Sequence, residues 1–285
     1  MGTAENGIYG KPISRPPRSD VRRFRGKVLV TRCTPRAGLT MTMLALMTAL
    51  VACSQVKSLS TGECTGDKPL VLVMVDGSST QNDPALIAEQ VEVVTAVARR
   101  TSDECGRLRV ERFRGSSSDV DLVLDRDVTP EGATSSNRDR NRDELLDEVR
   151  QEVEKGLAAS PARGGSDPVG AIGRGARLLR QEERDHRELI MVTDGVQSSS
   201  PNLATEELTA ATASGFVDQA GTLPDLTGID LVVTGLGRVS GAQPPSSYIN
   251  GLVAFYEEVC TRSGAASCRV VDALLLPGGS SGGGS

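Results

Sequence analysis

The segment that decides the fold is Leu70–Asp76, LVLVMVD, six apolar residues in a row that end in a carboxylate. A continuous apolar run of this length is typical of a strand buried on both faces of a parallel sheet. A second run, residues 188–195 (ELIMVTDG), contains a similar apolar stretch and reaches an acid at Asp194. Ligands of open α/β sheets gather at the carboxyl ends of strands, so these two acids mark the sheet edge where function is expected.

Strand and helix patterns alternate along the rest of the chain. Residues 119–128 alternate acidic and apolar side chains, as a half-exposed edge strand does. Further strands are expected at 107–113, 229–234 and 269–271, with helices at 84–101, 136–157, 169–179, 205–220 and 248–262. This order predicts an α/β domain with a doubly wound, mainly parallel sheet flanked by helices.

Charge is distributed unevenly along the 285 residues, whose formal net charge is −5. Residues 1–40 hold nine Lys/Arg and two acids, so the remainder holds 23 basic and 35 acidic residues, a net charge of about −12. The acidic main domain argues against nucleic-acid binding, and an aromatic content of 2% argues against stacking surfaces. The basic arm could bind nucleic acid, but an extended leader or a mis-assigned start codon explains it more simply.

An export signal is indicated by residues 39–52, LTMTMLALMTALVA, which follow Arg32 and Arg36. This uncharged run is too short for a transmembrane helix but has the length of a signal-peptide core. It ends in Leu50–Cys53, LVAC, which resembles a bacterial lipobox. The resemblance implies that the Cys53 thiol is lipidated and becomes the first mature residue. The alternative is a buried helix that happens to end in cysteine.

These features predict the organisation of the chain. Residues 1–52 are expected to form a basic leader plus lipoprotein signal peptide, 53–67 a tether, 68–272 one domain and 273–285 a flexible tail. The mature protein is then exported and lipid-anchored on the outer face of the cytoplasmic membrane. The long stretch ahead of the signal leaves open a translation start near Val28 or Met41.

Three polar segments carry the expected chemistry: DGSST at 76–80, GGSD at 164–167 and TDG at 193–195. In this order and context they resemble the metal-ion-dependent adhesion site of von Willebrand factor A (vWA) domains, over about residues 68–272. The resemblance implies a divalent cation, Mg²⁺ or else Mn²⁺ or Ca²⁺, at the top of the sheet. The positions that match the family's ligands are Asp76, Ser78, Thr80, Ser166 and Asp194.

The chemistry of this set is coherent, because Mg²⁺ takes oxygen ligands and retains several waters. In the family, few direct carboxylates leave the ion electrophilic, and an open position accepts an acidic residue from a partner. Thr80 stands where the family usually has Ser, and Ser166 where it has Thr, although both keep a hydroxyl. The alternative is that Asp76 and Ser78 cap the helix near residue 84 and that Asp194 forms a turn.

Four cysteines remain in the mature chain, an even number that favours two disulfides in an oxidising compartment. Three connectivities are possible. The family's sheet makes the first two strands parallel neighbours, which implies the pair Cys64–Cys105. The second pair is then Cys260–Cys268, joining the last helix to the last strand, while the absence of CxxC or a nearby histidine disfavours zinc there.

An enzyme is the competing class. A Ser-His-Asp hydrolase would need His186, the only histidine, which is expected at the opposite end of its strand from the polar segments. The glycine-rich residues 235–241 lack dinucleotide-loop spacing and are expected to be a strand-exit loop. We therefore expect a non-enzymatic, membrane-anchored binding module for a protein partner, with a metal-free scaffold of the same fold second and a hydrolase third.

Overall fold

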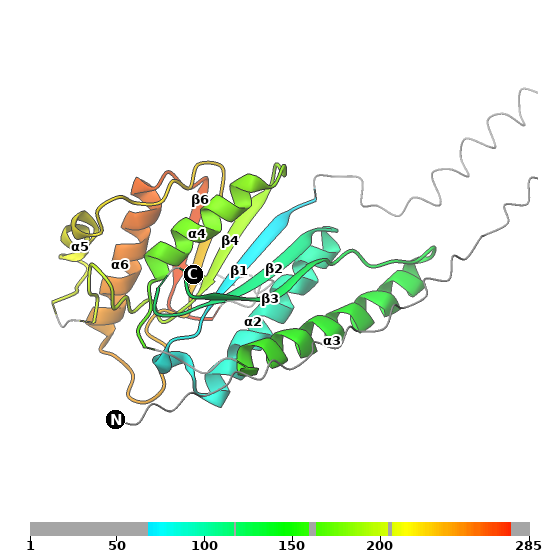
Figure 1. Ribbon diagram of the computed structural model, residues 1–285, viewed down its shortest axis with the longest axis horizontal. Helices are drawn as coiled ribbons and strands as arrows, with labels where there is room; N and C mark the ends of the chain where they lie inside the picture. Colours follow the sequence, from blue (N-terminus) through cyan, green and yellow to red (C-terminus); the bar gives the residue numbers. More distant parts are fainter. Residues whose placement is uncertain (1–67, 117, 160–163, 205–206, 275–285) are drawn as a thin grey trace, which may run out of the picture. The chain divides into compact units, whose positions relative to one another are not determined.

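The computed structural model describes residues 68–116, 118–159, 164–204 and 207–274. They form a six-stranded sheet in the order β3-β2-β1-β4-β5-β6 (Figure 1). All neighbouring strands are parallel except β2 and β3, which are antiparallel. The prediction of a doubly wound, mainly parallel sheet is confirmed. The strands are β1 Leu70–Asp76, β2 Arg107–Phe113, β3 Val120–Asp127, β4 Arg187–Val192, β5 Asp230–Thr234 and β6 Ser267–Val271.

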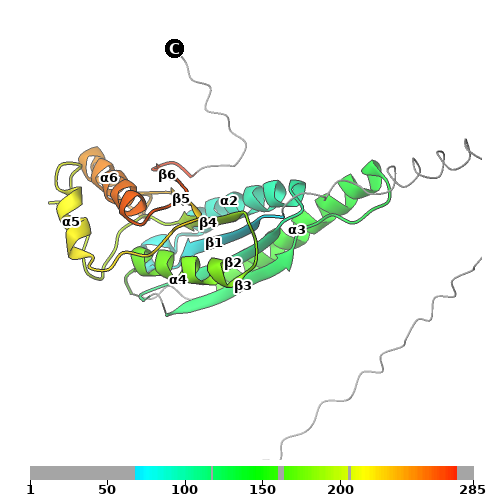
Figure 2. The ribbon, with the colours of Figure 1, turned by 90° about the horizontal axis from the view of Figure 1, so that it is seen from above.

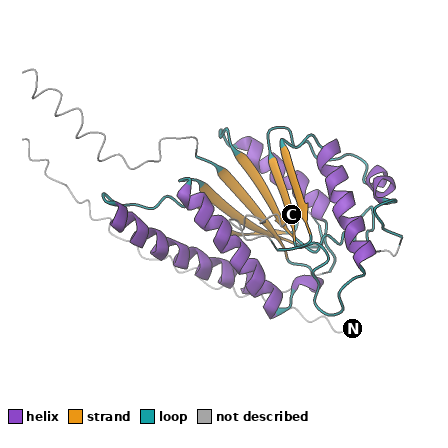
Figure 3. Ribbon diagram, turned by 180° about the vertical axis from the view of Figure 1, so that it is seen from behind, coloured by secondary structure: helices purple, strands orange, loops and turns teal. Residues whose placement is uncertain are grey.

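Helices cover both faces of the sheet, and Figure 2 shows α2 and α4 on opposite sides of the strands. The long helices α2 and α3 lie side by side over one face (Figure 3), while α4, α5 and α6 pack against the other. The helices are α2 Pro84–Asp103, α3 Ser135–Ala159, α4 Pro168–Gln181, α5 Ala213–Gln219 and α6 Ser246–Arg262, with a short 3-10 turn η1 at Ser79–Gln81.

The central strand β1 is buried along its whole length. Its apolar side chains alternate between two cores: Leu70, Leu72 and Met74 face α4 and α6, and Val71, Val73 and Val75 face α2 and α3. Every position therefore removes apolar surface from water, which explains why the segment reads as an unbroken apolar run.

Helices α2 and α4 begin with the same signal, an aspartate cap followed by proline. Asp83 accepts a hydrogen bond from the Ala85 amide at 2.8 Å, and Pro84 opens α2. Asp167 caps α4 in the same way, ahead of Pro168. Asp83, rather than Asp76 or Ser78, therefore supplies the side-chain cap of α2.

The expected helix at 205–220 is shorter than predicted, since α5 begins only at Ala213. The Thr212 hydroxyl forms hydrogen bonds with backbone groups just before α5: it donates to the Glu207 carbonyl and accepts from the Thr209 amide. Such local side-chain bonds compete with helical pairing and hold the chain in turns.

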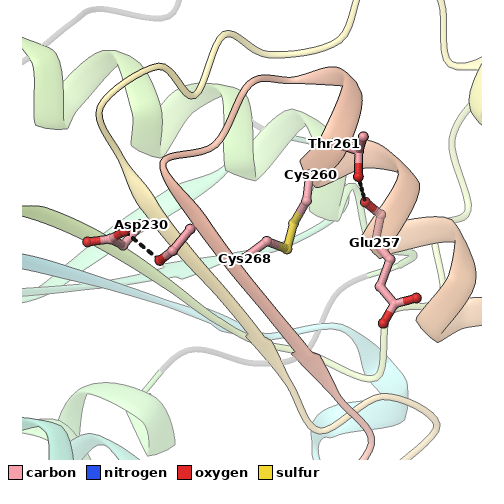
Figure 4. Close-up of a disulfide and its surroundings, with 6 residues drawn as sticks. Asp230, Glu257, Cys260, Thr261 and Cys268 are labelled. Carbon is pink, nitrogen blue, oxygen red and sulfur yellow. Dashed lines mark hydrogen bonds between the residues drawn. A yellow bond between two sulfur atoms is a disulfide. The ribbon is translucent and has the colours of Figure 1, made fainter.

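The disulfide Cys260–Cys268 is confirmed, with a Cα–Cα distance of 6.1 Å (Figure 4). It joins the C-terminal end of α6 to the start of β6, at the entry end of the parallel strands. The expected partner of Cys105, Cys64, lies outside the described residues, so that pairing stays a prediction.

The leader, the lipobox with Cys53 and the tether also lie outside the described residues, as does the tail from 275 onward. Ala273 and Leu274 still contact the domain: the Thr234 hydroxyl donates to the Ala273 carbonyl, and Leu274 packs beside the core under α2. Within the described ranges, no helix combines the length and apolar character needed to cross a membrane.

Candidate functional site

The structure brings together all five residues that the sequence predicted as metal ligands. Asp76 is the last residue of β1, Asp194 follows β4, and Ser166 precedes α4. The Ser166 hydroxyl donates to Asp76 Oδ2 at 2.8 Å, across 90 residues of sequence. The Thr80 hydroxyl donates to Asp194 Oδ2 at 2.5 Å, and Ser78 Oγ lies 3.0 Å from Thr80 Oγ1. Because Thr80 donates to Asp194, the Ser78 hydroxyl is the donor to Thr80.

Four of the five residues are buried and one is exposed. The Asp76 and Asp194 carboxyls are fully buried, and Ser78 and Ser166 are nearly so. Thr80 is exposed. Thr80, whose hydroxyl donates to Asp194, is therefore the one exposed member of the five.

Two further residues belong to the site and were not predicted. The Thr193 hydroxyl donates to Asp76 Oδ2 at 2.7 Å and accepts from the Gly195 amide. The Gln81 amide group donates to Asp194 Oδ2 at 3.3 Å and to the Arg238 carbonyl at 2.6 Å. Thr193 could have been found as the hydroxyl that ends a buried strand beside an acid. Gln81 carries no such signal, because it sits in a polar turn without periodicity.

Tight turns fix the second carboxylate. Asp194 Oδ1 accepts from the Val196 amide at 2.9 Å, and Gly195 between them has φ of 77°. A Cβ at that position would lie 2.4 Å from a methyl carbon of Leu236, so only glycine allows this approach. The loop at 235–241 leaves β5 as predicted and packs onto the site: the Gly237 amide donates to the Asp194 carbonyl at 2.8 Å.

The two carboxylates are electrostatically strained. Burial raises the pKa of Asp76 above its ordinary value, against the opposing effect of its hydrogen bonds. Burial and then the charge of Asp76 raise the pKa of Asp194 from 3.8 to about 7. The buried guanidinium of Arg112 feels the charge of Asp76 and donates to the Leu157 carbonyl. Two buried acids that repel each other are stabilised by an added cation.

The donor set suits a hard divalent cation. It consists of two carboxylates and three hydroxyls, the oxygen ligands that Mg²⁺, Mn²⁺ and Ca²⁺ prefer, and it offers no thiolate or imidazole for zinc. In the part of the chain that the structure describes, no cluster of three or more His, Cys, Asp or Glu side chains forms a metal cage. Hydroxyls and water would thus complete the ligand shell of any ion held here.

The residue required by a hydrolase lies elsewhere. His186 Nε2 is 3.3 Å from Asp230 Oδ2, just before β4 begins, whereas the candidate site follows the opposite ends of the strands. The structure does not bring His186 together with the serines of the site.

The structure is an α/β domain with a mainly parallel sheet, and the polar loops after β1, before α4 and after β4 meet at one edge of it. No protein-family model and no curated protein matches the chain. Structures of vWA domains are among the solved structures similar to it, including a von Willebrand factor type A protein from Catenulispora acidiphila. That match has 13% identity and a TM-score of 0.35, and it covers 70% of this chain and 43% of the other.

Two other similar structures are a bacterial minor pilin and a bacterial membrane protein. The PilB minor pilin from Streptococcus sanguinis matches at 11% identity and a TM-score of 0.41, over 74% of this chain and 59% of the pilin. An aerotolerance-related membrane protein from Bacteroides fragilis matches at 17% identity and a TM-score of 0.37, over 72% and 92%. The chain thus spans about three fifths of the pilin that it matches.

Proposed function

We propose that this chain is a membrane-anchored, extracytoplasmic binding module that recognises a protein partner through a divalent cation. The cation, Mg²⁺ in the first instance, would be held by Asp76, Ser78, Thr80, Ser166 and Asp194. The observation that carries the proposal is the meeting of two buried, mutually repelling carboxylates with three hydroxyls, of which that of the exposed Thr80 donates to Asp194. The sequence signal ending at Cys53 supports the anchor.

Each residue has a distinct role in this proposal. Asp76 and Asp194 supply negative charge from buried positions, and their burial keeps them in place. The hydroxyls of Ser78, Thr80 and Ser166 supply neutral oxygens, so the total charge of the ligands stays low. A bound Mg²⁺ would supply an electrophilic centre with an open position for a carboxylate of the partner.

A metal-free scaffold of the same fold is the second candidate, and one observation favours it. The cluster is already satisfied by its own hydrogen bonds, since each hydroxyl has a partner and both carboxylates accept from protein donors. An ion must therefore displace hydrogen bonds such as that between Thr80 and Asp194. The relief of carboxylate repulsion is the gain that would drive this exchange.

The test is affinity capture with the detergent-solubilised full chain from its native host, in Mg²⁺ and in EDTA. The proposed function predicts a co-purifying protein that is lost in EDTA and lost with Asp76→Ala. The matched control is Asp167→Asn, which retains a good helix cap one residue from Ser166 and should capture the partner normally. A partner retained equally in EDTA and by Asp76→Ala would support the metal-free scaffold instead.

A further inference from the structure

An apolar hollow lies beside the candidate cation site. It has a volume of about 580 Å³ and is lined by Val196, Ala204, Leu208, Pro244, Pro245 and Tyr248, together with Ser247. Its walls come from the loop after β4 and from the start of α6 with the loop before it. The volume falls in the range of about 300–1,000 Å³ that small-ligand pockets occupy. No charged side chain lines it, although the mature chain as a whole is strongly acidic.

A backbone amide near each wall of the hollow donates a hydrogen bond to a residue of the cation site. The Val196 amide donates to Asp194 Oδ1 at 2.9 Å, and the Ser240 amide, in the loop before α6, donates to the Thr80 carbonyl at 3.0 Å. Two residues of chain span at most about 7 Å, so Val196 lies within that distance of Asp194. The charge of Asp194 also contributes, after burial, to raising the pKa of Tyr248 to about 12.

The walls are held in position before any ligand arrives. The Tyr248 hydroxyl donates to the Leu203 carbonyl at 2.7 Å, which joins α6 to the loop after β4. Leu208 is buried, and the Tyr256 hydroxyl donates to the Gly195 carbonyl at 3.0 Å beneath them. A groove formed by ordered side chains loses little conformational entropy when a ligand binds.

We infer that this hollow is a specificity subsite that receives an apolar side chain of the protein partner, close in sequence to the acidic residue that binds the cation. The inference rests on the proposed function. Charge complementarity fixes the order of the two groups: the acidic residue can be accepted only at the cation, and the uncharged hollow accepts its apolar neighbour. Because an extended chain advances about 3.3 Å per residue, the two side chains should be separated by zero to three residues.

Immobilised glycine-serine peptides provide a defined probe. Each peptide carries one Asp and one Leu separated by zero to three residues, and matched peptides carry Asn for the Asp or Ala for the Leu. Binding of the detergent-solubilised full chain is measured in Mg²⁺ and in EDTA. We expect capture in Mg²⁺ alone, with a loss of at least tenfold, about 1.4 kcal/mol, when Ala replaces Leu or Asn replaces Asp.

Two variants obstruct the hollow without touching the cation ligands. Ser247→Trp fills it from an exposed position in the first turn of α6, and Ala204→Glu adds a charge from an exposed loop residue. The control is Ser246→Trp, an equally exposed neighbour that does not line the hollow. Both obstructing variants should lose at least tenfold in peptide binding, the control should not, and all three should take up Mg²⁺ in calorimetry as wild type does.

The outcomes separate the two proposals. Mg²⁺ uptake with no preference for the Asp-plus-Leu peptides, or with full binding by both obstructing variants, overturns the subsite and leaves the cation site standing. Absence of Mg²⁺ uptake by wild-type protein overturns the proposed function itself, and the subsite with it.

Discussion

Asp76→Asn separates the electrostatic role of the Asp76 carboxylate from its role as a hydrogen-bond acceptor. Asp76 is fully buried and accepts from the Ser78 amide and from the Ser166 and Thr193 hydroxyls, at 2.8, 2.8 and 2.7 Å. Asparagine has almost the same shape and keeps one acceptor oxygen. Its amide group can donate to a hydroxyl that rotates to accept. The substitution thus removes a buried charge and leaves most of the network intact.

The expected change in the free energy of unfolding follows from the raised pKa of the neighbouring Asp194 carboxyl. Raising the pKa of Asp194 from 3.8 to about 7 corresponds to about 4 kcal/mol against its ionised form. Burial is the larger cause and the charge of Asp76 the second. Removing the charge of Asp76 recovers part of this cost, so Asp76→Asn should be more stable than wild type at pH 8 in EDTA, by on the order of 1 kcal/mol.

Urea unfolding of the full chain, followed by circular dichroism in EDTA and in Mg²⁺, measures both effects. At a free Mg²⁺ concentration a hundred times its dissociation constant, wild type should gain about 2.7 kcal/mol. Asp76→Asn should gain nothing, because the ion has lost a charged ligand. The control Asp167→Asn keeps its α4 cap and should gain as wild type does.

Two results would contradict these expectations for Asp76. If Asp76→Asn is less stable than wild type in EDTA, the carboxylate is chiefly a structural acceptor and the repulsion between the two acids is unimportant. If Mg²⁺ stabilises the variant as much as wild type, the cation binds somewhere else.

Other predictions concern pH, the anchor and the disulfides. Because the folded-state pKa of Asp194 is raised, the contribution of Asp194 to stability in EDTA is full below about pH 4 and is lost as the pH rises through about 7. Mg²⁺ competes with the same proton, so the affinity for Mg²⁺ measured by calorimetry should increase from pH 6 to 8 and then level off. Mass spectrometry of membrane extracts should find an acylated mature N-terminus at Cys53, and soluble protein that retains its leader in the native host would contradict export. Non-reducing peptide mapping should recover Cys64 linked to Cys105, and four free thiols would also argue against export. Cys260→Ala should cost about 2–3 kcal/mol in urea unfolding without changing Mg²⁺ affinity, because the bridge lies at the entry end of β6; a change in affinity would show that the two ends of the sheet are coupled.

The strands could be predicted because burial on both faces leaves a direct trace in the sequence. The run at 70–76 matches β1 residue for residue, and the alternation at 119–128 matches the edge strand β3 within a residue at each end. The start of helix α5 could not be predicted, since it depends on hydrogen bonds of the Thr212 hydroxyl with the backbone of Glu207 and Thr209 rather than on apolar spacing. The spacing of apolar residues indicates which positions are buried, but it does not indicate where side-chain hydrogen bonds to the backbone replace helical pairing.

The candidate site likewise contains residues that strand patterns predict and residues that depend on how loops pack. Asp76 and Asp194 could be predicted because each closes an apolar strand, and parallel strands bring their carboxyl ends to one edge. Gln81 could not, because its contacts with Asp194 and with the carbonyl of Arg238 depend on how a turn and a distant loop pack together. The hollow beside the site has the same origin: Val196, Ala204 and Leu208 line one side of it, and residues 244–248, about 40 residues further along the chain, line the other.

The most direct test of the central claim is anomalous diffraction from crystals of the protein grown with Mn²⁺, a substitute for Mg²⁺ with a usable anomalous signal. We expect one strong peak at the carboxyl ends of β1 and β4, among the oxygens of Asp76, Ser78, Thr80, Ser166 and Asp194. Ordered crystals with no peak there, or with the strongest peak at another part of the surface, would contradict that claim.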